Sequence, residues 1–307
     1  MTFAVLFPGQ GSQFVGMGAD VFAARPDLVG ERADEILGFS LAGVCLDGPE
    51  EELTRTEHAQ PALFAISYAL WNALAAVVPP PAAAAGHSLG EYTALAGAGV
   101  LAYEVALAVV AERGRAMAAA ADVRPSGMAA VIGADVAATE EVCRRRRRSG
   151  GELWVANVNA PGQVVVAGAA ADLVWLGENA RDLGLRRVIP LAVAGAFHSP
   201  LMEPASGRLA AVLGPVELGE PRFPVYANVS ARPLDASGIV ENLIAQVVST
   251  VRFAETLEAM AAAGVDTFVH VGPGDVTAGL VKRTLPEATT LTVSSLGDIS
   301  AVAAALT

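Results

Sequence analysis

The stretch Gly86-His87-Ser88-Leu89-Gly90 is the key to the rest of the chain. A short apolar run, Pro81 to Ala85, precedes it, and Glu91 to Ala96 has the composition of a helix start. A strand, a G-x-S-x-G turn and a helix in that order form a nucleophile elbow, in which only glycine tolerates the tight turn beside the serine. The pattern predicts that Ser88 is a nucleophile that can be acylated once a base takes its proton. The alternative is a chance match in a chain rich in glycine and alanine.

A second informative turn follows the first predicted strand. Residues 3–7, FAVLF, are continuously apolar, as expected of a strand buried on both faces. Pro8-Gly9-Gln10-Gly11-Ser12-Gln13 comes directly after them. Ligands of α/β sheets bind at the carboxyl ends of the strands, so Gln10 and Gln13 are candidate ligand-binding residues. The alternative is a tight turn with two solvated glutamines.

The middle of the chain has a different pattern, and we assign it to a second domain. It predicts strand, helix, strand, strand, helix and strand at residues 128–132, 136–145, 153–158, 164–167, 169–183 and 187–191. This order is the ferredoxin-like arrangement. We therefore predict an α/β protein. Residues 1–124 and 192–307 form a large domain with a parallel sheet and helices on both faces, and residues 125–191 form an inserted small domain.

Two long helices are predicted in the large domain. The first begins at Gln60-Pro61, with Pro61 in its first turn, and continues to Val78. The second extends over residues 101–121 and is apolar except for a few charged residues, which include Arg113 and Arg115. Residues two apart on a helix point in different directions, so one arginine is expected to face the site and the other water. The spacing alone does not say which.

Composition and charge exclude several classes of function. The chain has 307 residues, 53% of them hydrophobic, and a net charge of −12, which argues against a general nucleic-acid binder. Cys45 and Cys143 are far apart and form no C-x-x-C motif, so neither a disulfide framework nor a zinc site is expected. The first residues lack the basic segment of a signal peptide, and glycines and a glutamate interrupt the most apolar window, residues 94–111. We therefore expect a cytoplasmic protein without a membrane span.

The chain contains four histidines from which a base for Ser88 can be chosen. His198 follows a small-residue loop and lies downstream of the nucleophile, as in hydrolase-like folds, and is the first choice. His270, at the end of a predicted strand, is the second. His87 is expected to point away from the Ser88 hydroxyl because the two residues are adjacent, and His58 lies in a charged segment.

A serine hydrolase would also carry a carboxylate between the nucleophile and the base. Asp135 and Asp172 lie in that interval, but both fall within the predicted small domain and are poor candidates. Without a carboxylate, a backbone carbonyl must orient the imidazole. This is the first indication that the protein is not an ordinary esterase.

Six motifs together identify a family that the chain resembles. They are residues 9–13 (GQGSQ), 86–92 (GHSLGEY), 113–114 (RG), 157–164 (NVNAPGQV), 196–202 (AFHSPLM) and 271–274 (VGPG). In this order and spacing they resemble the malonyl-CoA:acyl carrier protein transacylase family, which includes the acyltransferases of polyketide synthases. The resemblance covers nearly the whole chain. It implies a hydrolase-like large domain with a ferredoxin-like insert.

The resemblance also implies a ping-pong mechanism. Ser88, activated by His198, would attack the thioester of malonyl-CoA, leaving a malonyl-serine ester after CoA departs. The phosphopantetheine thiol of an acyl carrier protein would then attack that ester, with His198 again as the base. The oxyanion hole would consist of the backbone N–H groups of Leu89 and Gln10.

Further residues receive binding and orienting roles from the resemblance. Arg113 matches the arginine that holds the malonyl carboxylate, a pairing for which a bidentate guanidinium is suited. Gln246 aligns with the glutamine whose main-chain carbonyl receives the Nδ1–H of His198. Phe197 is expected to crowd an α-methyl branch, which favours malonyl over methylmalonyl. Gly195 replaces a different residue of the family motif and suggests a somewhat roomier pocket.

Three interpretations of function follow. The first is malonyl transfer to an acyl carrier protein for fatty-acid or polyketide synthesis, with a substituted malonyl unit as the alternative substrate. The second is a hydrolase that clears wrong acyl groups from carrier proteins, and Arg113 argues against it because that role suits monocarboxylic chains. The third is a scaffold without chemistry. No metal, nucleotide or redox cofactor is expected, and a monomer is the default state.

An acidic carrier protein needs a basic surface on this acidic chain. Arg144 to Arg148, in the predicted small domain, is one candidate for that surface. Arg186-Arg187 and Lys282-Arg283 are the others. The alternative for the arginine run is a solvated helix end.

Overall fold

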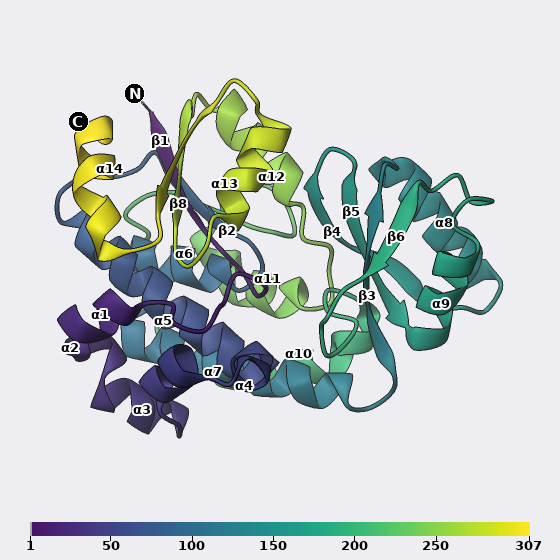
Figure 1. Cartoon of the computed structure of the whole chain (residues 1–307), viewed down its shortest axis with the longest axis horizontal. Helices are drawn as coiled ribbons and strands as arrows, with labels where there is room; N and C mark the ends of the chain where they lie inside the picture. Colours follow the sequence, from purple (N-terminus) through teal and green to yellow (C-terminus); the bar gives the residue numbers. More distant parts are fainter. Residues whose placement is uncertain (1) are drawn as a thin grey trace.

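A computed structural model describes residues 2–307 and arranges them around two β-sheets (Figure 1). The strands of the larger, parallel sheet are β1 (Phe3–Phe7), β2 (Ala83–Gly86), β7 (Val225–Tyr226), β8 (Thr267–Val271) and β9 (Thr289–Val293). Their order is β7-β2-β1-β8-β9, with the continuously apolar β1 at the centre. Phe7, at the end of β1, is opposite Gly86, at the end of β2. The loop after β1 and the turn after β2 therefore leave the sheet side by side.

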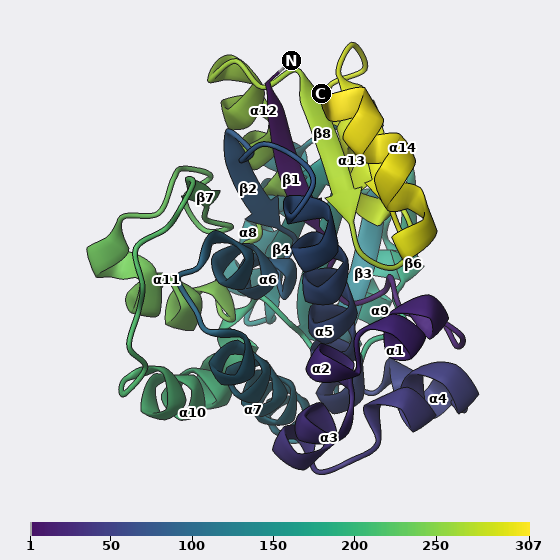
Figure 2. The same cartoon turned by 90° about the vertical axis from the view of Figure 1, so that its left-hand side faces the viewer.

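Helices surround this sheet (Figures 1 and 2). They are α1 (Ala19–Ala24), α2 (Pro26–Val29), α3 (Glu31–Leu37), α4 (Glu50–Thr54), α5 (Thr56–Ala75), α6 (Gly90–Ala98), α7 (Tyr103–Ala121), α10 (Glu203–Leu213), α11 (Ile239–Gln246), α12 (Phe253–Ala262), α13 (Val276–Thr284) and α14 (Ile299–Leu306). Short 3₁₀ or π turns occur at η1 (Gly43–Asp47), η2 (Pro200–Met202), η3 (Ala236–Gly238) and η4 (Leu296–Asp298). Alternate side chains of β1 enter two cores: Val5 and Phe7 pack with α5 and α6, and Ala4 and Leu6 pack with α12 and α13. Both faces are therefore covered, as predicted.

The second sheet is antiparallel and lies beside the first (Figure 1). Its strands are β3 (Ser126–Ile132), β4 (Leu153–Ala160), β5 (Gln163–Ala169) and β6 (Arg187–Pro190), in the order β4-β5-β3-β6. Helices α8 (Val136–Arg148) and α9 (Ala170–Glu178) pack on one face. The predicted order of strands and helices and the α/β fold class are confirmed. The domain boundaries at residues 125 and 191 remain predictions.

Helix α5 begins earlier than the sequence analysis predicts. It starts at Thr56 rather than Gln60, so Pro61 lies inside the helix. A proline there removes one backbone hydrogen bond. Packing outweighs that loss, because α5 and α7 cross so closely that a Cβ at Gly114 would lie 2.9 Å from the Thr56 carbonyl oxygen.

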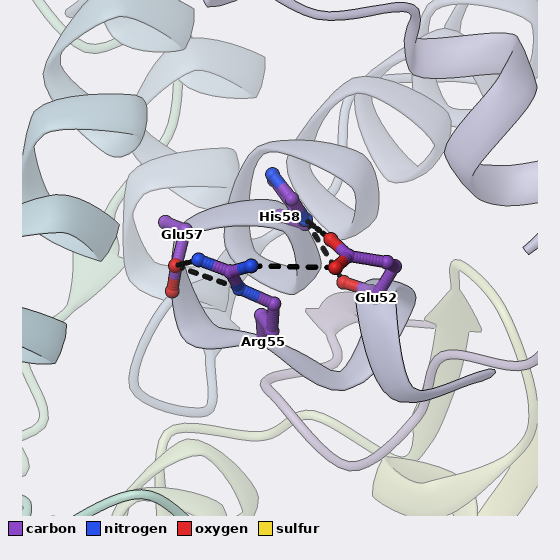
Figure 3. A network of polar contacts seen from close by, with 4 residues as sticks. All are labelled: Glu52, Arg55, Glu57 and His58. Atoms are coloured by element: carbon purple, nitrogen blue, oxygen red, sulfur yellow. Dashed lines mark hydrogen bonds and ion pairs between the residues drawn. The ribbon is translucent and has the colours of Figure 1, made fainter. Parts of the chain in front are cut away.

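A polar network at the junction of α4 and α5 holds the start of α5 (Figure 3). Arg55 pairs with Glu52 at 3.3 Å and with Glu57 at 2.6 Å. His58 Nδ1 donates to the main-chain oxygen of Glu52 at 2.9 Å, and its ring lies 4.6 Å from the ring of Phe39. This network is distant from the elbow in the sequence. It nevertheless fixes the position of the first turns of α5, and these turns reach the site described below.

Other element ends depend on local features. The apolar window at residues 94–111 is divided between α6 and α7 at Gly99, which has a φ of 88°. The helix predicted at residues 169–183 ends at Glu178, where Asn179 Nδ2 donates to the Trp175 carbonyl at 2.8 Å. Helix α14 is absent from the sequence-based prediction.

Across residues 2–307, no helix has both the length and the apolarity needed to traverse a bilayer.

Candidate active site

Ser88 lies on a strained turn between β2 and α6. Its φ is 52°, in the left-handed region that non-glycine residues rarely adopt. A Cβ at Gly86 would lie 1.8 Å from the Gly90 carbonyl carbon, and a Cβ at Gly90 would lie 2.3 Å from the Phe7 carbonyl oxygen. Both glycines are therefore required because backbone segments approach closely there. The strand, turn and helix have the geometry of a nucleophile elbow.

The close approach at Gly90 predicts a large loss of stability. Gly90→Ala should lower the free energy of unfolding by about 3 kcal/mol or more, because the added carbon overlaps backbone rather than a mobile side chain. Gly177→Ala is the matched control, since Gly177 lies inside α9 and an added Cβ there meets nothing within 4 Å. That change should stabilise the protein by about 0.5–1 kcal/mol. Urea unfolding measures both variants, and a Gly90→Ala protein as stable as the wild type contradicts the packing argument.

His198 is held beside the Ser88 hydroxyl. Its Nε2 lies 2.7 Å from Ser88 Oγ, and its Nδ1 lies 2.9 Å from the main-chain oxygen of Gln246. A carbonyl oxygen can only accept, so Nδ1 carries the proton and Nε2 can accept the proton of Ser88. Gln246 is the last residue of α11, where carbonyl groups point out of the helix. A helix-terminal carbonyl thus occupies the place that a carboxylate has in a serine hydrolase.

Burial and charge keep the His198 ring neutral. The residue is 4% exposed, and desolvation together with the positive charge of Arg113 lowers its pKa from 6.5 to about 3. A neutral imidazole is the form that acts as a general base.

This lowered pKa predicts a ring that does not titrate near neutrality. In the free enzyme, the His198 nitrogen-15 resonances should show a neutral ring from about pH 8 down to about pH 5. The unfolded chain binds a proton near pH 6.5 that the folded site rejects, so this residue makes folding stability fall as the pH drops below about 6.5. A His198 ring that titrates near pH 6.5 in the folded protein contradicts this assignment.

Arg113 is the second charged group at the nucleophile. Its residue is 1% exposed, and its Nη2 donates to Ser88 Oγ at 3.0 Å and to Gln246 Oε1 at 2.9 Å. Its Nη1 donates to Gln60 Oε1 at 2.6 Å. Arg115, by contrast, points outward with 45% of its side chain exposed. The structure therefore answers the question that the spacing leaves open, and Arg113 is the arginine that faces the site.

Sequence reasoning missed three polar residues around Ser88. Gln60 is interpreted there only as a helix start, and Glu91 only as part of the next helix and of the motif at residues 86–92, without a role of its own. Asn228, which the sequence analysis does not single out, accepts from the Ser88 N–H at 2.7 Å and donates to the Gly86 carbonyl at 2.7 Å. The available signal was a polar residue within an apolar segment, which applies most clearly to Asn228, between Ala227 and Val229.

A cavity of about 150 Å³ opens in front of Ser88. Gln10 and Leu89 line it, and within residues 2–307 their backbone N–H groups form no hydrogen bond. Two unpartnered donors beside a nucleophile have the chemistry of an oxyanion hole. Side chains from both sheet regions complete the lining: Gln60, His87, Arg113, Met117, Met128, Asn157, Asn159, Val165, Leu191, Val193, Phe197 and His198.

Two neighbours of His198 bear on the size of this cavity. Phe197 is 5% exposed and lines it. Gly195 does not enlarge it: a Cβ at Gly195 would lie 2.5 Å from Ala121 Cβ, at the end of α7. The expectation of a roomier pocket at Gly195 is therefore wrong, because the absence of a side chain there allows close packing against Ala121.

The other histidines near the sheet have different surroundings. His270 is fully buried, with Nδ1 2.6 Å from Thr277 Oγ1 and Nε2 3.1 Å from the Gly272 carbonyl. Both ring nitrogens of His270 form hydrogen bonds in the core, so the second choice of base for Ser88 is wrong. That the His87 side chain points away from the Ser88 hydroxyl stays a prediction; the residue lines the cavity, and its ring lies 5.3 Å from the ring of Phe253. Its Nε2 lies 2.7 Å from Asn159 Oδ1 on β4, so a contact with the second sheet holds the ring there.

The aspartates between Ser88 and His198 in sequence have structural contacts elsewhere. Asp135 accepts from the Ala138 N–H at 2.7 Å and caps α8. Asp172 pairs with Arg146 at 2.6 Å. Neither aspartate lines the cavity.

Three arginines of the run Arg144–Arg148 form ion pairs with carboxylates of the second sheet and its helices. Arg144, Arg146 and Arg147 each pair with a carboxylate at distances between 2.6 and 2.7 Å. Within residues 2–307, neither Arg145 nor Arg148 forms an ion pair. Helix α8 packs on the face of the second sheet that is turned away from the first sheet (Figure 1). Arg145 and Arg148 are thus the arginines of this run whose charge no ion pair offsets, and docking at this run, at Arg186-Arg187 or at Lys282-Arg283 stays a prediction.

Comparisons with known proteins fit this geometry. A family model described as an acyl transferase domain matches residues 4–300. The malonyl CoA-acyl carrier protein transacylase of Bacillus subtilis is 41% identical over 294 residues, which cover 95% of this chain and 93% of that protein. A polyketide biosynthesis protein of Burkholderia thailandensis is 39% identical over 290 residues, covering 92% of this chain and 24% of that protein. A solved malonyl-transacylase in complex with a type II polyketide synthase acyl-carrier protein has a TM-score of 0.94 and 36% identity, with 99% of this chain and 100% of that chain covered.

Proposed function

The chain belongs to the acyl transferase family, and we propose that it moves a malonyl group from malonyl-CoA to the phosphopantetheine thiol of an acyl carrier protein through an ester on Ser88. One observation carries the proposal. Ser88 Oγ lies 2.7 Å from the neutral His198 and 3.0 Å from the buried guanidinium of Arg113. The histidine makes the serine a nucleophile, and the arginine suits an acyl group that ends in a carboxylate.

The first half-reaction forms the ester. Ser88 Oγ attacks the thioester carbonyl carbon while His198 Nε2 takes the hydroxyl proton. The N–H groups of Gln10 and Leu89 stabilise the negative charge that develops on the carbonyl oxygen. The carbon–sulfur bond then breaks, and His198 gives its proton to the departing sulfur of CoA.

The second half-reaction is the reverse sequence with a different thiol. The phosphopantetheine thiol of the carrier protein gives its proton to His198 and attacks the ester carbonyl. The bond to Ser88 Oγ breaks, and His198 returns the proton to the serine. One base therefore serves both halves, as a ping-pong mechanism requires.

Arg113 and Phe197 support an unsubstituted malonyl group as the acyl unit. A guanidinium pairs with a carboxylate through two parallel hydrogen bonds, and a low-dielectric cavity strengthens this pairing. Phe197 occupies space beside His198 in a cavity of about 150 Å³, which disfavours an α-branch. A hydrolase for monocarboxylic acyl chains would have no use for a buried arginine at its nucleophile.

The remaining parts of the proposal concern partners and setting. The names of the relatives support an acyl carrier protein in fatty-acid or polyketide synthesis as the acceptor. Acyl exchange between a serine and thiols needs a base and an oxyanion hole, so we propose no cofactor or metal. We propose that the protein works as a monomer. Cys45 and Cys143 are buried free thiols, which suits the reducing cytoplasm.

Radiolabelled malonyl-CoA followed by holo acyl carrier protein tests this function. Label should bind stably to Ser88, be absent in Ser88→Ala, and move to the carrier protein. Release of the label to water would support a hydrolase, and an unlabelled protein would support a scaffold. A parallel reaction with methylmalonyl-CoA tests the acyl unit, and faster labelling by that thioester would overturn the malonyl assignment.

A further inference from the structure

A buried carboxylate lies behind the nucleophile. Glu91, the second residue of α6, is 0% exposed and does not line the cavity. It accepts hydrogen bonds from Asn242 Nδ2 at 2.6 Å, from Gln246 Nε2 at 2.7 Å and from the Asn228 N–H at 3.0 Å. Burial raises its pKa to about 7, against the opposing effect of these donors and of Arg113. A buried acid of this kind requires a partner network, and this one leads to the site.

The Gln246 side chain connects Glu91 with Arg113. Gln246 Nε2 donates to Glu91 Oε2 at 2.7 Å, and Gln246 Oε1 accepts from Arg113 Nη2 at 2.9 Å. Both Glu91 oxygens accept hydrogen bonds and a guanidinium can only donate, so the Gln246 amide has one favourable orientation, because the reverse would place its NH₂ against the guanidinium. Glu91 therefore favours the orientation in which the amide oxygen faces Arg113. Gln246 Nε2 also donates to the Ser88 carbonyl at 3.0 Å, which holds the amide in place from a third side.

We propose that Glu91 is a positioning residue for Arg113, acting through the Gln246 side chain, and that it thereby selects acyl groups with a free carboxylate. This inference rests on the proposed function. In the free enzyme, Arg113 Nη2 has two acceptors, Ser88 Oγ and Gln246 Oε1. Once Ser88 carries an ester, its Oγ is a poor hydrogen-bond acceptor, because its lone pair is shared with the carbonyl, while the Gln246 oxygen remains a good one. The oriented amide is thus the contact that keeps Arg113 in place while the acyl carboxylate is held.

The test compares two ways of acylating Ser88. Malonyl-CoA uses Arg113, whereas p-nitrophenyl acetate has no carboxylate and reports on Ser88 and His198. The measured quantity is the ratio of the two second-order rate constants, malonyl-CoA over p-nitrophenyl acetate. Glu91→Ala should lower this ratio about 10- to 100-fold, the effect expected from one hydrogen bond to a charged group.

Two more variants separate positioning from a general structural role. Glu91→Gln keeps an oxygen for Gln246, and the Asn242 amide can turn to accept from the new NH₂, so the ratio should recover most of the loss. Gln246→Met cuts the connection at its other end and keeps the main-chain oxygen that binds His198. It should lower the ratio as Glu91→Ala does, and it decides the matter if Glu91→Ala does not fold.

Asn242→Ala is the matched control. It removes a donor from the same carboxylate on the side away from Gln246, so the ratio should stay within about threefold of the wild type. Equal losses with both substrates in Glu91→Ala and Gln246→Met would overturn the positioning role. A wild-type enzyme that malonyl-CoA fails to acylate would instead contradict the proposed function, which keeps the two failures distinguishable.

Discussion

His198→Ala should lower the rate of Ser88 acylation by malonyl-CoA about 10⁴-fold, near the upper end of what a general base contributes. The imidazole Nε2 lies 2.7 Å from Ser88 Oγ, and the other polar contact of that oxygen is a donor, Arg113, which cannot take a proton. Rapid quenching with radiolabelled malonyl-CoA measures the rate of ester formation directly. The loss should appear in this chemical step rather than in the binding of malonyl-CoA.

His270→Gln is the matched control for the choice of base. His270 is as buried as His198, but its nitrogens contact Thr277 and Gly272 in the core. The variant should lose about 1–3 kcal/mol of stability by leaving a buried partner unsatisfied. Its acylation rate below the unfolding temperature should remain close to that of the wild type. A comparable loss of rate in both variants would refute the assignment of His198.

Arg113→Lys should lower kcat/KM for malonyl-CoA about 100-fold, although it keeps the charge. A lysine presents one ammonium instead of a planar fork, and it leaves the oxygens of Gln60 and Gln246 without the donors that now reach them. The carboxylate is bound in the ground state and in the transition state, so much of the effect should appear in KM. Steady-state transfer to holo carrier protein measures both constants.

Arg115→Lys provides the same substitution two residues along α7. Its side chain is 45% exposed, and its guanidinium donates to the Leu37 carbonyl, away from Ser88. We expect kcat/KM to change by less than about twofold, as for most surface substitutions. Similar losses in the two variants would show that the effect belongs to the helix rather than to the site.

The nucleophile and its elbow could be predicted because their causes are local. Gly86 and Gly90 flank Ser88 within five residues, and the steric requirement for glycine is expressed in that short stretch. The predicted start of α5 at Gln60 failed for the opposite reason. A contact with Gly114 and the network around Arg55 decide that start, and propensity does not record such packing.

The candidate site shows the same division. Motif order led to Ser88, His198 and Arg113, but Glu91 and Asn228 were missed, because their roles depend on contacts with residues far away in sequence. Glu91 is hydrogen-bonded to Gln246, 155 positions away in the sequence, and Ser88 is hydrogen-bonded to Asn228, 140 positions away. A single sequence holds no record of such pairs.

The sequence alone determined the order of strands and helices around the second sheet, the α/β class, the bend that presents Ser88 and the small set of residues able to act with it. Each of these follows from side-chain period, glycine sterics or motif spacing, which operate over a few residues. Only the tertiary structure decided that Glu91 and Asn228 lie behind Ser88, that His270 belongs to the core, and that Gly195 serves packing. Those outcomes depend on sheet register and helix crossing, which bring together atoms that are far apart along the chain.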